Sequence, residues 1–255
     1  MKTLRIAVLL MLVAAPNWAA TSFIQEVHSL VTGATRAEGF QDVNKVFGPP
    51  QGSETGLMGS LDVLNLGIGG EIILRFRNPV IYNGPGPDFT VFENVFYDQT
   101  SGRPAGSTNL ETGTVAVSSD GIFFLEFPTQ YLVQDPPVNP DYNPDHYIGF
   151  AGLRPTFSHP NNGISPFDPT VSGGDSFDLE DLVGLPGAER LDFENIRYVR
   201  IRDTGINPTD SLGVPLPEPP QPGDQGFDLD ALAVINGKQD TGRTSVPDEV
   251  WQVYP

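Results

Sequence analysis

Runs of β-branched and aromatic residues, bounded closely by glycine and proline, set the pattern of hydrophobic and polar positions along this chain. Such runs are typical of β-strands. The strands predicted in this way span residues 71–76, 89–96, 114–118, 122–127, 196–202 and 227–236, with a weaker candidate at 61–66. Asp120 and Gly121 separate two of these runs, and because both residues tolerate positive φ they predict a tight hairpin turn.

Two stretches interrupt the strand pattern. Residues 131–172 are rich in Pro, Asn and Asp, and residues 207–226 are rich in proline. Because proline has no N–H to donate to a ladder, neither stretch can form a central strand, and both are expected to be long loops. No strong helix is predicted, although residues 178–183 can form one turn. The pattern therefore predicts an all-β fold, an antiparallel β-sandwich of jelly-roll type with long Pro/Asn/Asp-rich loops.

The first twenty residues have the layout of a secretory signal peptide. Lys2 and Arg5 precede an apolar run at residues 6–15, and Pro16 and small residues follow. This run is too short to span a bilayer, and the alternative is a buried N-terminal helix. We expect a signal peptide at 1–20, a single sandwich domain at 21–240 and a tail at 241–255. The mature form is expected not to insert into a membrane and to be secreted or at the extracellular surface, with the periplasm as an alternative.

The net charge and the cysteine content of the chain limit the classes of molecule that it is expected to bind. The chain has a formal net charge of -18 and no cysteine. So acidic a protein repels phosphate backbones, which argues against nucleic-acid partners, and it attracts divalent cations. The alternative is that the negative charge serves only to keep the protein soluble. Without disulfides, the fold is expected to be stabilised by its core or by bound ions.

Several acidic residues continue apolar rows of the predicted strands. Strict alternation places Phe227, Leu229, Ala231, Ala233 and Ile235 on one face of their strand. Asp228 and Asp230 then share the other face with apolar neighbours. Glu93 follows Phe89 and Val91 on one face, and Asp203 follows Val199 and Ile201.

A carboxylate beside a core is costly unless it is paired, and calcium, which accepts six to eight oxygens, removes that cost. The alternative for each acid is a role in a turn. The predicted metal ligands are Asp88, Glu93, Asn94, Asp203, Asp228 and Asp230, with calcium as the cofactor.

Two segments carry a resemblance to a known family. Residues 83–94 (NGPGPDFTVFEN) and 226–234 (GFDLDALAV) resemble the exported bacterial "cell-surface proteins" with a jelly-roll-like domain. The match extends over most of residues 40–236. The resemblance implies a secreted, calcium-stabilised β-sandwich with no assigned enzymatic activity, and it supplies no ligand.

Enzymatic chemistry finds little support in the sequence. His28, His146 and His159 do not have a metal-binding spacing, and neither a nucleophile elbow nor a phosphate-binding loop is found. No catalytic residue is predicted. A binding or adhesion module fits better, because the loop aromatics Tyr142, Tyr147 and Phe157 lie among polar residues that suit a glycan or another surface protein. The alternatives are that these rings anchor the loop, that the protein is a structural surface or matrix protein, or that it is a polysaccharide-active enzyme.

Overall fold

The computed structural model describes residues 22–217 and 226–240, and it is almost entirely β. The predicted signal peptide and C-terminal tail lie outside the described residues. The strands are β1 (Glu26–Val31), β2 (Leu64–Asn65), β3 (Glu71–Arg75), β4 (Val80–Ile81), β5 (Phe89–Glu93), β6 (Gly113–Ser118), β7 (Leu125–Glu126), β8 (Gln130–Tyr131), β9 (Tyr147–Ile148), β10 (Asp175–Phe177), β11 (Tyr198–Asp203), β12 (Asp228–Val234) and β13 (Gly237–Lys238).

The helical segments in the described part of the chain are short 3-10 turns. They are η2 (Val43–Val46), η3 (Pro144–His146), η4 (Leu179–Leu182) and η5 (Ala188–Arg190). The single turn predicted at residues 178–183 is η4, and Asp178 caps it by accepting a hydrogen bond from the Glu180 amide at 2.9 Å. Across residues 22–217 and 226–240, no helix has the length and apolar character needed to cross a membrane.

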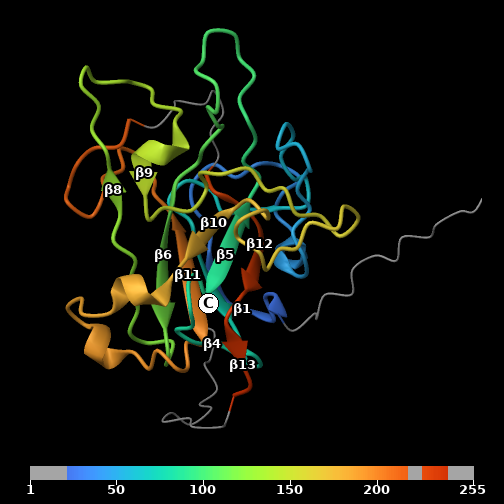
Figure 1. Cartoon of the computed structure of the whole chain (residues 1–255), viewed down its shortest axis with the longest axis vertical. Coiled ribbons are helices and arrows are strands. Elements are labelled where there is room, and N and C mark those ends of the chain that lie inside the picture. The colour runs from blue at the N-terminus through green and yellow to red at the C-terminus, as the bar shows by residue number, and fades with distance from the viewer. Residues whose placement is uncertain (1–21, 218–225, 241–255) are drawn as a thin grey trace, which may run out of the picture.

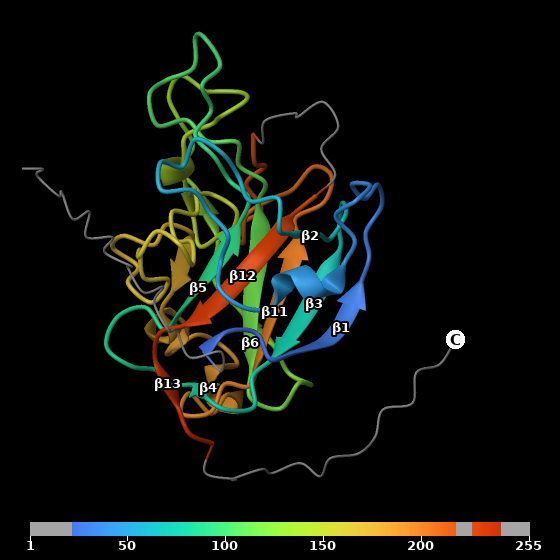
Figure 2. The same ribbon diagram turned by 90° about the vertical axis from the view of Figure 1, so that its right-hand side faces the viewer.

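Two antiparallel sheets form the body of the molecule. One has the strand order β1-β3-β11-β6-β7 and the other the order β10-β5-β12-β2. Figure 1 shows β5 and β12 side by side, and Figure 2 shows them in front of β6 and β11 of the larger sheet. One apolar cluster takes side chains from both sheets, such as Ile72 and Val199 from one and Val91 and Leu232 from the other. This shared core confirms the predicted antiparallel sandwich, while its jelly-roll connectivity stays a prediction.

Every predicted strand range overlaps an observed strand, and the central ones match most closely. Residues 71–76, 114–118 and 196–202 correspond to β3, β6 and β11, whereas only Leu125–Glu126 of residues 122–127 forms a strand. Asp120 and Gly121 form the predicted turn. Gly121 has a φ of 77°, and Asp120 accepts the amides of Ile122 and Phe123 at 2.8 and 2.9 Å.

The strict alternation predicted along β12 is wrong, because this strand contains a β-bulge. Leu229 pairs with Glu93 and Ala231 with Phe92, so Asp230 is an extra residue between two consecutive pairs. Phe227, Leu229, Leu232 and Val234 therefore face the main core. Ala231 faces outward with Ala233, toward a separate cluster that contains Phe23 and Phe92.

Candidate metal centre

Three carboxylates meet at one end of the sandwich. They belong to Glu93 at the end of β5, Asp228 at the start of β12 and Glu111 just before β6. One oxygen from each lies within 4.8 Å of the others. Because Glu111 leads into the larger sheet and the other two residues belong to the smaller one, the cluster spans both layers.

Glu93 is the buried member of this cluster. Its side chain follows Phe89 and Val91 on the core face of β5, as the alternation predicted, and the residue is 1% exposed. The Asp228 amide donates to Oε1 at 3.1 Å, but Oε2 has no hydrogen-bond partner among the described residues. Burial raises the pKa of Glu93 well above its usual range, and the charges of Glu111 and Asp228 raise it further. Within residues 22–217 and 226–240, no ion pair therefore gives Glu93 a counter-charge.

Two asparagine side chains orient Asp228. Asn65 Nδ2 donates to Oδ1 at 2.8 Å, and Asn94 Nδ2 donates to Oδ2 at 3.0 Å. Asn94 was predicted as a metal ligand, and the structure instead places its amide nitrogen on the Asp228 carboxylate. These contacts fix the direction in which the Asp228 oxygens face the cluster.

Close backbone contact positions Glu111. Its amide donates to the carbonyl oxygen of Gly152 at 3.1 Å. Gly152 has a φ of +81°, and a Cβ at this position would lie 1.9 Å from the Glu111 carbonyl oxygen. Glycine is therefore required for the segment around residue 152 to hold Glu111 against the end of β5.

The donor set fits a hard cation. All three side chains offer carboxylate oxygens, which suit calcium, and no histidine or cysteine belongs to the cluster. A divalent cation would supply the positive charge that the buried Glu93 carboxylate lacks. Glu93, Glu111 and Asp228 are the side chains that would hold it.

The structure places two other predicted ligands at loop closures. Asp88 accepts the amides of Gly84 and Leu179 at 2.8 and 2.7 Å, together with Asn236 Nδ2 at 2.8 Å. Asp203 follows Val199 and Ile201 into the buried row, as predicted, and it accepts three backbone amides. These belong to Gly69, Gly205 and Phe227, at 2.6, 2.8 and 2.9 Å. Both carboxylates therefore hold loops against the sandwich, and neither belongs to the group of three carboxylates.

Asp230 also lies outside the cluster. It is the extra residue of the bulge and has no paired residue on β5. It is 1% exposed, its Oδ2 accepts the Gln51 amide at 2.9 Å, and Oδ1 has no hydrogen-bond partner. Burial raises the pKa of Asp230 to about 8, and Asp62 contributes in the same direction, while the Gln51 amide and the Ser60 hydroxyl oppose the shift. Of the two acids predicted as metal ligands on this strand, only Asp228 belongs to the carboxylate cluster.

Sequence reasoning missed Glu111. Its only signal is an acid placed just before an apolar strand, and many acids of this chain have such a position. The proximity of Glu111 to Glu93 depends on how the two sheets stack. Alternation along a single strand does not encode that stacking.

The three loop aromatics predicted to bind a ligand have different environments. Tyr147 is 2% exposed and its hydroxyl donates to the Asp141 carbonyl at 2.8 Å, so its ring anchors the loop and offers no face for stacking. The guanidinium carbon of Arg103 lies over the ring of Tyr142, at 3.4 Å from the ring centroid. Phe157 is half-buried, with its ring centroid 6.3 Å from that of Tyr97.

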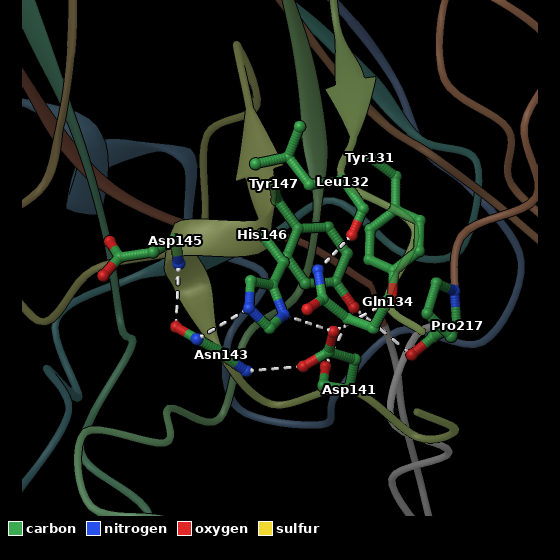
Figure 3. A network of polar contacts seen from close by, with 9 residues as sticks. All are labelled: Tyr131, Leu132, Gln134, Asp141, Asn143, Asp145, His146, Tyr147 and Pro217. Atoms are coloured by element: carbon green, nitrogen blue, oxygen red, sulfur yellow. Dashed lines mark hydrogen bonds and ion pairs between the residues drawn. The ribbon is translucent and has the colours of Figure 1, made fainter. Parts of the chain in front are cut away.

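Figure 3 shows how polar contacts fold the loop around Asp141. This buried carboxylate accepts the Tyr131 hydroxyl at 2.9 Å and His146 Nδ1 at 2.6 Å on one oxygen, and the Asn143 amide at 3.0 Å on the other. The second ring nitrogen of His146 is 3.0 Å from Asn143 Nδ2. Burial, followed by the hydrogen bond to Asp141, raises the pKa of the Tyr131 hydroxyl. Both His146 nitrogens thus have intramolecular partners, and the arrangement organises the loop.

Comparison with known proteins identifies no relative, so the functional conclusion below is based on the geometry of the carboxylate cluster. The sequence matches no protein-family model and no curated protein.

Proposed function

We propose that this protein is a calcium-stabilised β-sandwich binding module of exported type, with the ion held by Glu93, Glu111 and Asp228. The observation that carries the proposal is Glu93 Oε2, a buried carboxylate oxygen without a hydrogen-bond partner that belongs to a cluster of three carboxylates. An unpaired buried charge is hardly tolerated, and a divalent cation supplies the missing partner.

The position of the cluster gives the ion a structural role. Glu93 and Asp228 belong to adjacent strands of the smaller sheet, and Glu111 precedes β6 of the larger sheet. A cation shared by these side chains would cross-link the two layers where no disulfide does so, since the chain has no cysteine. The expected affinity is that of extracellular calcium modules, about 0.1 to 1 mM.

Calcium is expected to raise the thermal midpoint of the wild-type protein relative to EDTA. At a calcium concentration about ten times the dissociation constant, linkage gives about 1.4 kcal/mol of added stability. Glu93→Gln should abolish this response. In EDTA the variant should be at least as stable as the wild type, because it removes a buried charge that lacks a counter-charge. Differential scanning calorimetry of both proteins, with and without calcium, measures these effects.

Glu54→Gln is the matched control, since Glu54 is exposed and lies outside the cluster. This variant should keep the full calcium response. The proposal fails if calcium leaves the wild-type midpoint unchanged, or if Glu93→Gln and Glu54→Gln respond equally.

The binding role and the location of the protein belong to the same proposal. The resemblance of residues 83–94 and 226–234 to exported cell-surface proteins supports secretion or display at the cell surface. The loop at residues 131–172 supports binding, because ordered loops on a rigid scaffold commonly carry recognition. A glycan or another surface protein is the proposed partner. A structural matrix protein and a polysaccharide-active enzyme are the alternatives.

A further inference from the structure

A cavity of about 500 Å³ is lined by residues of β9 and β10 and of the segments beside them. Its wall combines apolar and charged side chains, including those of Pro128, Asp145, Ile148, Arg154, Asp175 and Asp181. It is separate from the carboxylate cluster, none of whose three residues lines it.

The charge in this cavity is negative. Three carboxylates face one guanidinium, and Arg154 is already engaged with two of them, at 2.9 Å from Asp145 and 3.3 Å from Asp175. Asp175 is 5% exposed, and burial raises its pKa to about 6 despite the guanidinium. Burial and the neighbouring charges of Asp178 and Glu180 also raise the pKa of Asp181. With three carboxylates and one guanidinium, the formal charge of the cavity wall is negative.

The apolar part of the wall is aliphatic where it meets solvent. Pro128 is exposed and Ile148 is 47% exposed. The aromatic side chains of the wall are all buried, namely Phe127, Tyr147, Phe150 and Phe177. No aromatic face of this wall is thus available to stack against a sugar ring. An alkyl chain can lie along Pro128 and Ile148.

We propose that this cavity binds the side chain of a lysine carried by a basic segment of another protein. The four-carbon stem of lysine would lie against Pro128 and Ile148, and its ammonium would pair with Asp145 and Asp181 at the rim. The formal net charge of -18 favours the approach of such a partner over long distance. The inference goes beyond calcium binding and does not depend on it.

The test is a titration of the full chain into a fluorescein-labelled peptide in which four lysines alternate with glycine. Fluorescence anisotropy at low ionic strength should show saturable binding. A peptide with glutamine in place of lysine should bind at least tenfold more weakly. Asp181→Asn should weaken binding of the lysine peptide at least fivefold. Glu54→Gln, an equal change of charge at an exposed site outside the cavity, should leave binding within twofold.

Arg154→Gln should change the affinity for the lysine peptide in the opposite direction to Asp181→Asn. This variant distinguishes a cation-binding site from other kinds of site. Removal of the competing guanidinium should strengthen binding of the lysine peptide at least threefold, provided that thermal unfolding shows the variant to be folded. Weaker binding by a folded Arg154→Gln variant would overturn the proposal. Equal effects of Asp181→Asn and Glu54→Gln would do the same, because they would indicate nonspecific charge attraction.

Two further measurements keep this inference distinct from the proposed function. The titration is repeated in EDTA, where binding of the lysine peptide should persist whether or not the carboxylate cluster binds calcium. Neutral oligosaccharides are added as competitors and should not displace the peptide. Displacement by a saccharide would assign the cavity to glycans, which overturns the lysine inference while leaving the broader binding role intact.

Discussion

At the scale of single residues, the buried carboxylates of this protein fall into two groups. Asp88 and Asp203 accept backbone amides on both carboxylate oxygens, which offsets part of the cost of burying their charge, although burial still raises the pKa of Asp88. Glu93 and Asp230 each have one oxygen without a hydrogen-bond partner. A buried acceptor without a partner costs about 1–3 kcal/mol, and a charged one costs more. The second group is therefore where a proton or a cation has the largest effect.

Asp230→Asn should stabilise the protein increasingly as pH rises. The pKa of Asp230 is about 8 in the fold, against an ordinary value of 3.8 for an aspartate. Between these values the folded state retains a proton that the unfolded chain has lost, so the wild type loses stability as pH rises from about 4 to 8. Each pKa unit corresponds to about 1.4 kcal/mol. Asparagine removes this loss, and its Oδ1 can still accept the Gln51 amide.

The measurement is chemical denaturation of both proteins in EDTA at several pH values. The difference in unfolding free energy should grow from pH 4 to pH 8 and level off above that. A constant difference across this range would mean that Asp230 does not carry the raised pKa.

Part of the candidate site could be predicted from residue order. Glu93 was expected beside the core because it follows Phe89 and Val91, and the structure buries it. Asp228 was expected near an ion, and it lies in the carboxylate cluster. Glu111 was not predictable, because its neighbours come from the other sheet. A contact of this kind depends on tertiary packing that alternation within one strand does not contain.

At the scale of elements, the bulge of β12 explains why alternation failed there. An extra residue shifts every later side chain by one position in sequence while the pairing with β5 continues. Leu232 and Val234 therefore face the same core as Phe227 and Leu229, although strict alternation placed them on the opposite face, with Asp228 and Asp230. The sequence around Asp230 contains no glycine that would have marked a bulge.

Deletion of Asp230 should be tolerated better than deletion of Leu232. Without Asp230, Leu229 and Ala231 become adjacent, and their partners Glu93 and Phe92 are already adjacent on β5. Each remaining side chain of β12 then stays on the same face of the sheet as in the wild type. Deletion of Leu232 instead moves Ala233 and Val234 to opposite faces, which removes two aliphatic side chains from the core. Thermal unfolding should show a cooperative transition for the first variant and none for the second, and the reverse order would contradict the assigned register.

Strands with strong apolar alternation were the predictable elements of the fold. β3, β5, β6, β11 and β12 all lie in predicted ranges, and they supply most of the core. β1 was missed because most of its residues are half-buried and include His28 and Ser29. β10 was missed because three residues are too few to show a period. Tertiary contacts, rather than local pattern, define these peripheral strands.

At the scale of the whole molecule, one strand near the C-terminus holds the smaller sheet together. β12 pairs with β5 on one side and β2 on the other. Phe227, Leu229, Leu232 and Val234 all belong to the main core. Removal of this strand would leave β2 without its strand partner and the core open along one layer.

A chain truncated after residue 226 should therefore not fold. It keeps every strand of the larger sheet but loses four core side chains, each worth about 2–5 kcal/mol when a large apolar group is removed. Such a loss is comparable to the whole stability of a typical domain. Near-ultraviolet circular dichroism and thermal unfolding should show neither fixed tertiary packing nor a cooperative transition. A cooperative transition in the truncated chain would contradict this central role of β12.

The same position of β12 has a consequence for how the protein is made. The strand that completes the core is synthesised long after the side chains it covers, since Phe89 pairs with Val234. At roughly 5–20 residues per second, the newly made apolar face of β5 waits on the order of ten seconds for its partner. During synthesis this face is uncovered and can associate with other nascent chains. Folding of the sandwich is thus completed only after nearly all of the described chain has been made.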